Sequence, residues 1–142
     1  MKTLKFNLFF LLSITCSSTV FAQTYQAAAD KILGIYWSPK KDAKIEIYKT
    51  GSHYFGKSIW VASPRQDTEN PDPSLRSRQV LGIDLLRNFI YEDEGYTQGK
   101  VYDPESGKTY DCKMKLNGDY LKIRGYIGLS LFGRTEVFKR IN

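Results

Sequence analysis

Apolar and polar side chains alternate with a period of two over most of the chain beyond residue 34, and this alternation predicts β-strands. It is clearest between residues 110 and 116, where the apolar side chains are Tyr110, Cys112, Met114 and Leu116. The sequence Asn117-Gly118-Asp119 follows and is typical of a tight hairpin turn. In the next strand Leu121, Ile123 and Ile127 are predicted to face inward. These segments predict an antiparallel hairpin with one apolar face.

Further strands are predicted by the same alternation and by the turns between them. They cover residues 44–50, 53–61 and 134–141, with turns at Gly51-Ser52 and at residues 103–107. We count seven or eight short strands, and no helix is long enough to connect parallel strands. The chain is therefore predicted to be all-β, an antiparallel barrel or sandwich. Closure into a small barrel is favoured because it leaves no exposed edge.

Two segments depart from the alternation. Residues 26–33 contain three alanines and predict a short N-terminal helix that ends at Gly34. Residues 63–79 contain three prolines among polar side chains, so this segment cannot form an interior strand. Ordered loops of this length are often functional, which makes the segment the first place to look for a site.

Residues 1–22 have the layout of a secretory signal peptide. A positively charged start precedes an apolar stretch at residues 6–14 and the cleavage motif Val20-Phe21-Ala22. The apolar stretch is shorter than the roughly 20 residues that span a bilayer. A buried N-terminal helix, or lipidation at Cys16, fits the pattern less well. We therefore expect one β-barrel domain over residues 23–142, exported to the periplasm or secreted, without a transmembrane segment.

Charge and cysteine content change with removal of the signal peptide. The formal net charge of +6 falls to +4, because Lys2 and Lys5 are lost. An exported protein rarely meets nucleic acid, so a mild positive charge favours anionic lipid head groups, glycans or small acids. Cys112 is left alone, which excludes an intramolecular disulfide. On the apolar face of its strand, this thiol is expected to behave as a small hydrophobic group.

Catalytic chemistry is poorly supplied in this sequence. His53 is the only histidine, and no motif for a nucleophile–base pair or a zinc site is present. We therefore predict a protein that is not an enzyme, with no catalytic residue, metal or cofactor. The proline-containing loop offers oxygen atoms from Asp67, Glu69, Asn70 and Asp72. Their spacing differs from the calcium-binding loop pattern, so turn and capping chemistry is the expected role.

The same loop supplies the candidate ligand site. Arg76 and Arg78 are two residues apart, so in an extended chain they project to the same side. Two neighbouring guanidinium groups can hold a carboxylate or a phosphate. With Asn70 and Asp72 they form the predicted ligand-binding set. The alternative is that both arginines form internal salt bridges to loop carboxylates such as Asp67 or Asp72.

Two functions follow from this pattern. An eight-stranded barrel is either packed with side chains or just wide enough for one small ligand. The first function is therefore a barrel that binds a small hydrophobic or anionic ligand. The second is a packed barrel that acts as a protein-interaction or scaffold module and meets another protein of the envelope.

Several motifs carry a resemblance to a known family. Gly34-Ile35-Tyr36-Trp37 opens the first strand, and Asn70-Pro71-Asp72-Pro73 lies in the loop. Val101-Tyr102-Asp103-Pro104 and Ile123-Arg124-Gly125-Tyr126 follow, and the order and spacing of all four motifs match those of the family named below. From about Ile32 to Arg140 the chain resembles the bacterial exported family catalogued as domain of unknown function 2147. The resemblance implies a lipocalin-like β-barrel and brings no established activity.

The resemblance also implies a structural motif at one end of the barrel. Lipocalin-like barrels pack the aromatic side chain of a Gly-x-Trp motif in the first strand under an arginine of the last strand. Here Gly34 and Tyr36 occupy those places, with Trp37 adjacent. The arginine across the ring is expected to be Arg134 or Arg140. Such a cation–π contact stabilises a fold by roughly 0.5–2 kcal/mol.

Overall fold

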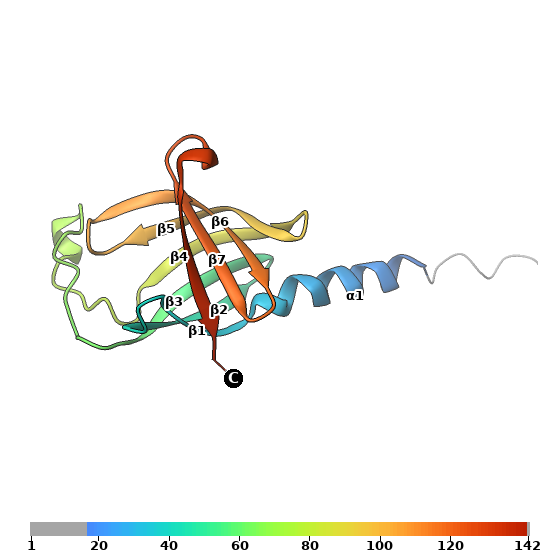
Figure 1. Cartoon of the computed structure of the whole chain (residues 1–142), viewed down its shortest axis with the longest axis horizontal. Helices are drawn as coiled ribbons and strands as arrows, with labels where there is room; N and C mark the ends of the chain where they lie inside the picture. Colours follow the sequence, from blue (N-terminus) through green and yellow to red (C-terminus); the bar gives the residue numbers. More distant parts are fainter. Residues whose placement is uncertain (1–16, 142) are drawn as a thin grey trace, which may run out of the picture.

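The chain forms a closed barrel of eight antiparallel strands in a computed structural model that describes residues 17–141 (Figure 1). Each strand pairs with its neighbour in sequence, and β8 closes the barrel by pairing with β1. The strands are β1 Gly34–Trp37, β2 Ala43–Thr50, β3 His53–Val61, β4 Asp84–Glu92, β5 Gly95–Asp103, β6 Lys108–Asn117, β7 Tyr120–Tyr126 and β8 Arg134–Arg140. The predicted antiparallel barrel is confirmed, and the sandwich is excluded.

Helical segments are short and lie outside the barrel wall. They are α1 Ser17–Ala29 and the 3-10 turns η1 Asp30–Ile32, η2 Pro73–Leu75 and η3 Ser130–Phe132. The predicted helix at residues 26–33 is present but begins earlier, and Gly34 is already the first residue of β1. Residues 1–16 of the predicted signal peptide lie outside the described residues. None of the helices within residues 17–141 has the length and apolar content needed to cross a membrane.

The predicted apolar faces fill the barrel interior. Cys112, Met114, Leu121 and Ile123 are all buried, as the alternation requires. The prediction for Ile127 is wrong: β7 ends at Tyr126, and Ile127 is 76% exposed in the loop that follows. The apolar pattern continues past the end of the strand, so alternation alone did not mark where pairing stops.

Aromatic rings pack the middle of the barrel. Tyr36, Tyr54, Tyr96 and Phe89 are among the largest fully buried side chains. Gly99 of β5 lies so close to Phe89 that a Cβ atom at this position would come within 2.3 Å of the ring. At this level the interior is therefore filled by protein, with no room for even one added methyl group.

The end of α1 and η1 close one end of the barrel, at the right of Figure 1. Buried tyrosine hydroxyls hold this segment in place. They donate hydrogen bonds from Tyr36 to the Ile32 carbonyl (2.8 Å), from Tyr96 to the Ala29 carbonyl (2.6 Å) and from Tyr54 to the Asp30 carboxylate (2.6 Å). Each hydroxyl thus finds a partner while its ring remains in the core.

Arg140 completes this closed end. Its guanidinium carbon lies 4.8 Å from the centre of the Tyr36 ring, and its Nη atoms donate to the carbonyls of Leu33 (2.8 Å) and Lys31 (2.5 Å). The ring and arginine of the expected motif are therefore Tyr36 and Arg140.

The other candidates for this motif lie elsewhere. Trp37 packs edge-on against Trp60, with a ring separation of 5.4 Å. Arg134, the other arginine considered for the motif, is 85% exposed and pairs with Glu136. The strand register explains this, because β8 reaches β1 only at its last residues, where Tyr36 lies opposite Arg140.

Replacing Arg140 should destabilise the fold measurably. We expect Arg140→Ala to lower the free energy of unfolding by about 2 kcal/mol, because it removes two hydrogen bonds and a cation–π contact. Arg134→Ala removes only an exposed ion pair and should change stability by less than about 0.5 kcal/mol. Urea denaturation of the two variants checks this, and equal losses would contradict the assignment of Arg140.

Candidate functional site

The long segment between β3 and β4 folds over the opposite end of the barrel, at the left of Figure 1. As predicted, residues 63–79 form no interior strand; they contain η2 and a single isolated bridge between Gln66 and Gln79. The segment packs closely against the β5–β6 turn, where a Cβ atom on Gly107 would lie 1.8 Å from the Glu69 carbonyl oxygen. We call residues 62–83 the β3–β4 loop.

A buried carboxylate anchors this loop. Asp67 is fully buried, and Tyr102 donates a hydrogen bond to its Oδ1 atom at 2.5 Å. Its Oδ2 atom accepts from Asn70 Nδ2 at 2.7 Å and from Nε and Nη2 of Arg78 at 2.9 and 2.8 Å. Burial alone would raise the pKa of Asp67, but the bonds from Tyr102, Asn70 and Arg78 outweigh it and hold the pKa below its ordinary value.

Asn70 and Asp72 serve the loop's own backbone. Besides Asp67, Asn70 Nδ2 contacts the Tyr102 hydroxyl at 3.1 Å, and Asn70 Oδ1 accepts from the Asp72 N–H at 2.9 Å. Asp72 caps η2 by accepting from the N–H and hydroxyl of Ser74, and these bonds lower its pKa. This is the turn and capping chemistry expected for the loop.

Arg76 and Arg78 do not project side by side. Arg78 forms the internal salt bridge to Asp67, one of the two carboxylates considered from the sequence. Arg76 instead donates from Nε to the carbonyl of Asn70 at 2.8 Å. The reason is local: η2 turns the backbone just before Arg76, so the spacing of an extended chain does not apply.

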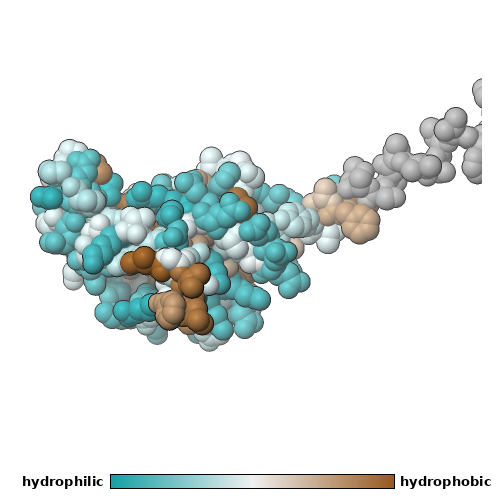
Figure 2. Space-filling view, turned by 90° about the horizontal axis from the view of Figure 1, so that it is seen from above, coloured by the Kyte–Doolittle hydropathy of each residue, from teal (hydrophilic) through white to brown (hydrophobic). Residues whose placement is uncertain are grey.

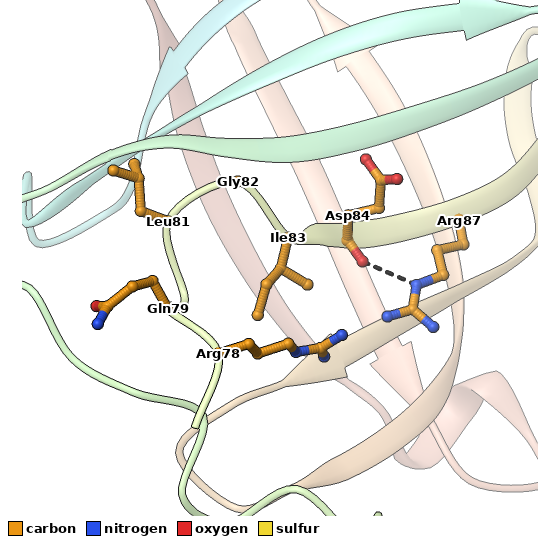
Figure 3. A pocket seen from close by; sticks show the side chains of 7 residues that line it. All are labelled: Arg78, Gln79, Leu81, Gly82, Ile83, Asp84 and Arg87. Atoms are coloured by element: carbon orange, nitrogen blue, oxygen red, sulfur yellow. Dashed lines mark hydrogen bonds between the residues drawn. The ribbon is translucent and has the colours of Figure 1, made fainter. Parts of the chain in front are cut away.

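A surface hollow of about 570 Å³ opens beside this anchor (Figure 3). Its lining comes from the end of the β3–β4 loop and the start of β4, namely Arg78, Gln79, Leu81, Gly82, Ile83, Asp84 and Arg87. Of the predicted ligand-binding set, only Arg78 reaches it.

The hollow lies outside the barrel wall. Val101 of β5 packs against the core, so the next residue, Tyr102, faces outward. The loop covers the Tyr102 ring and leaves it 5% exposed. The guanidinium carbons of Arg78 and Arg87 both lie 5.9 Å from the centre of that ring. Loop, β4 and β5 thus build one polar cluster on the outer surface.

Arg87 is the member of this cluster that sequence reasoning missed. Its Nε atom donates to the backbone carbonyl of Asp84 at 2.8 Å, and Figure 3 shows the Asp84 carboxylate turned away from it. That carboxylate accepts instead from the Tyr48 hydroxyl at 2.8 Å. Within residues 17–141 the Nη atoms of Arg87 have no hydrogen-bond or ion-pair partner. The available signal was an arginine within the mostly apolar stretch from Leu85 to Ile90.

The remaining candidates for chemistry lie apart from this cluster. His53 is exposed at the start of β3, 3.3 Å from the Ser52 hydroxyl. Cys112 is fully buried, and burial raises the pKa of its thiol to about 12. In the part of the chain that the structure describes, no three His, Cys, Asp or Glu side chains gather as a metal site.

Comparisons with known proteins agree with this architecture. The family model described as "Uncharacterized protein conserved in bacteria (DUF2147)" matches residues 34–140. Protein HP1028 of the human pathogen Helicobacter pylori, described as belonging to the lipocalin family, superposes with a TM-score of 0.72. The two chains are 24% identical, and the match covers 79% of this chain and 84% of HP1028. At this identity the likeness establishes a shared fold. No protein with a curated description matches the chain significantly.

Proposed function

The chain belongs to the DUF2147 family of bacterial proteins, and we propose that it binds a small anionic ligand in the hollow beside the β3–β4 loop. The observation that carries this proposal is Arg87, a cation whose Nη donors have no partner within the described residues. A guanidinium group fixed by one bond and open at its other end is well suited to receive a carboxylate or phosphate.

The surrounding charges leave Arg87 as the receiving group. Arg78 also lines the hollow, but its Nε and Nη2 atoms are engaged by the buried Asp67. Asp84, the carboxylate nearest in sequence, is hydrogen-bonded to Tyr48 and points away. The centre of the Tyr102 ring lies 5.9 Å from the guanidinium carbon of Arg87, within cation–π range.

Apolar side chains next to Arg87 favour an amphiphilic ligand. Leu81 is 50% exposed at the rim of the hollow, and Ile83 forms part of its floor. A ligand with an acidic head and a hydrocarbon body would pair with Arg87 and cover the exposed side chain of Leu81 at once.

We also propose that the protein works as a binding protein after export, and not as an enzyme. The predicted signal peptide supports export to the periplasm or the medium. Two side chains support a non-catalytic role. Among the described residues the exposed His53 contacts only the hydroxyl of its neighbour Ser52, and burial raises the pKa of the Cys112 thiol, which disfavours the reactive thiolate.

A fluorescent fatty-acid analogue tests the ligand proposal. We expect dansylaminoundecanoic acid to bind saturably, and its uncharged methyl ester to bind at least about tenfold more weakly, since a charge-assisted hydrogen bond contributes about 1.5–3 kcal/mol. Arg87→Gln should reduce binding of the acid to the level of the ester. Arg65→Gln, which changes an exposed arginine of the same loop, should leave binding unchanged.

The unfolding midpoint of Arg87→Gln should fall only slightly below that of the wild type, because one hydrogen bond and one cation–π contact at 5.9 Å are lost. Equal binding of acid and ester, or full binding by Arg87→Gln, would refute the proposal. If the acid binds as expected, native mass spectrometry of the protein isolated from its own cells should show the natural ligand as a discrete added mass.

A second candidate function rests on the packed interior. The contact between Gly99 and Phe89 favours a solid barrel that acts through its surface on another envelope protein. In that case affinity purification from envelope extracts should return one partner in a fixed ratio, and the fatty-acid analogue should not bind.

A further inference from the structure

The loop between β7 and β8 exposes an unusual concentration of apolar side chains. It follows β7 at the same end of the barrel as the β3–β4 loop and contains η3. Four large apolar residues within six positions are between 68 and 79% exposed: Ile127, Leu129, Leu131 and Phe132. Figure 2 shows the resulting apolar patch, surrounded by hydrophilic surface. Contiguous exposed apolar groups of this kind mark interaction sites.

The protein holds this loop in its exposed conformation. Arg124 donates from Nε to the Ser130 carbonyl at 2.7 Å and from Nη2 to the Leu131 carbonyl at 3.0 Å. Lys113 reaches the Ser130 hydroxyl at 3.1 Å. Gly133 lies so close to β7 that a Cβ atom there would be 2.5 Å from the Gly125 carbonyl. The apolar tips are therefore presented by a fixed scaffold.

The outer face of the adjoining strands is basic, and its charges oppose one another. Lys113 lies directly opposite Arg124, and Lys115 directly opposite Lys122, across the β6–β7 pair. Like charges in directly opposed positions destabilise a sheet. Lys139 adds a further cation on the outer side of β8. Two adjacent repulsive pairs are explained if this face meets an anionic surface.

The acidic groups nearest this face are already paired or lie off it. Asp111, the next outward residue of β6, is bonded to Lys100. Glu136 lies opposite the inward-facing Ile123 and pairs with Arg134. Asp119 is in the β6–β7 turn, at the far end of these strands. The face beside the apolar loop is thus predominantly positive.

We propose that the β7–β8 loop and the basic face of β6 and β7 dock the protein on an anionic lipid bilayer. The apolar side chains of the loop enter the headgroup region, while the lysines and the arginine contact anionic headgroups. Apolar burial and electrostatic attraction to anionic lipids together strengthen the binding of peripheral proteins to membranes. The occupant is a membrane surface, because a flat anionic surface satisfies the apolar tips and the repulsive lysine pairs together. This surface shares no residue with the hollow around Arg87 and does not depend on the ligand proposed there.

Vesicle flotation tests the docking surface, using the protein as it accumulates in its own cells. We expect the wild type to float with vesicles of phosphatidylcholine and phosphatidylglycerol, and not with phosphatidylcholine alone. Leu131→Ser/Phe132→Ser should weaken binding about tenfold or more. Leu75→Ser, a matched change of an exposed leucine in the β3–β4 loop, should have no effect. Every variant carries the same N-terminal segment, so its contribution cancels.

Lys122→Glu separates docking from folding. It turns the repulsive pair with Lys115 into an attractive one, so the unfolding midpoint should rise or stay constant while vesicle binding falls about fivefold or more. Lys31→Glu, which reverses an exposed charge at the closed end, should leave binding unchanged. Wild-type protein that ignores anionic vesicles, or full binding by Leu131→Ser/Phe132→Ser, would overturn the proposal. A third outcome would also overturn it: the wild type sediments as a dimer and does not bind vesicles, and the double variant sediments as a monomer.

Discussion

Gly107→Ala is expected to displace the β3–β4 loop from the end of the barrel. Gly107 has φ +68°, where an L-residue is strained by roughly 1–2 kcal/mol. An added Cβ would also lie 1.8 Å from the Glu69 carbonyl oxygen, a backbone atom that cannot move without moving the loop. Overpacking adds about 1–3 kcal/mol to this strain, so we expect the free energy of unfolding to fall by about 2–5 kcal/mol in total.

Gly118→Ala is the matched control for this change. Gly118 has a similar φ of +58° in the β6–β7 turn, but a Cβ atom there meets nothing within 4 Å. It should therefore lose only the strain, about 1–2 kcal/mol. Denaturant unfolding gives the two values, and limited proteolysis within residues 63–79 reports loop displacement. Equal losses in both variants, with no new cleavage in the loop, would mean that Gly107 does not hold the loop.

Asp67→Asn should destabilise the protein by about 3 kcal/mol. Tyr102, Asn70 and Arg78 all donate to this carboxylate, and an amide presents N–H donors where an acceptor is required. Removing one partner of a buried ion pair typically costs about 3–5 kcal/mol, and the partial exposure of Arg78 places this case at the lower end. Glu69→Gln, an exposed change in the same loop, should stay within about 0.5 kcal/mol of the wild type.

The stability difference between wild type and Asp67→Asn should also depend on pH. The folded pKa of Asp67 lies below its ordinary value of 3.8, so the ionised group stabilises the fold at all pH values above 3.8. That contribution is lost as the pH falls through the folded pKa, and the two unfolding curves should converge in strong acid. Asp30 and Asp72 also have lowered pKa values, but both proteins share them, so their contribution cancels. A difference that is independent of pH would contradict the charged anchor.

The barrel was predictable because its signals are local. Alternation over residues 110–116 and the turn at Asn117-Gly118-Asp119 depend on neighbours in sequence, and both match the structure. The residues at which the strands end were harder to predict from the sequence. Ile127 continues the apolar pattern, but β7 ends at Tyr126, the last of its residues to pair with a neighbouring strand.

The candidate site was only partly predictable because it depends on distant contacts. The loop and its Asp67–Arg78 pair were within reach of the sequence, since both residues lie in one polar segment. Arg87 was not, because its role arises from a ring fifteen positions away, Tyr102, and from a loop folded over the outer wall. The choice of Arg140 over Arg134 likewise follows from the register between the first and last strands.

The pairing of the first and last strands also determines when the barrel can close during synthesis. The barrel closes only when β8, the last strand to be synthesised, meets β1, and Arg140 reaches back to secure the segment that begins it. Strands emerging earlier from the ribosome can pair as hairpins, but none of them can seal the barrel. The nascent chain therefore cannot form the closed barrel until β8 has been synthesised.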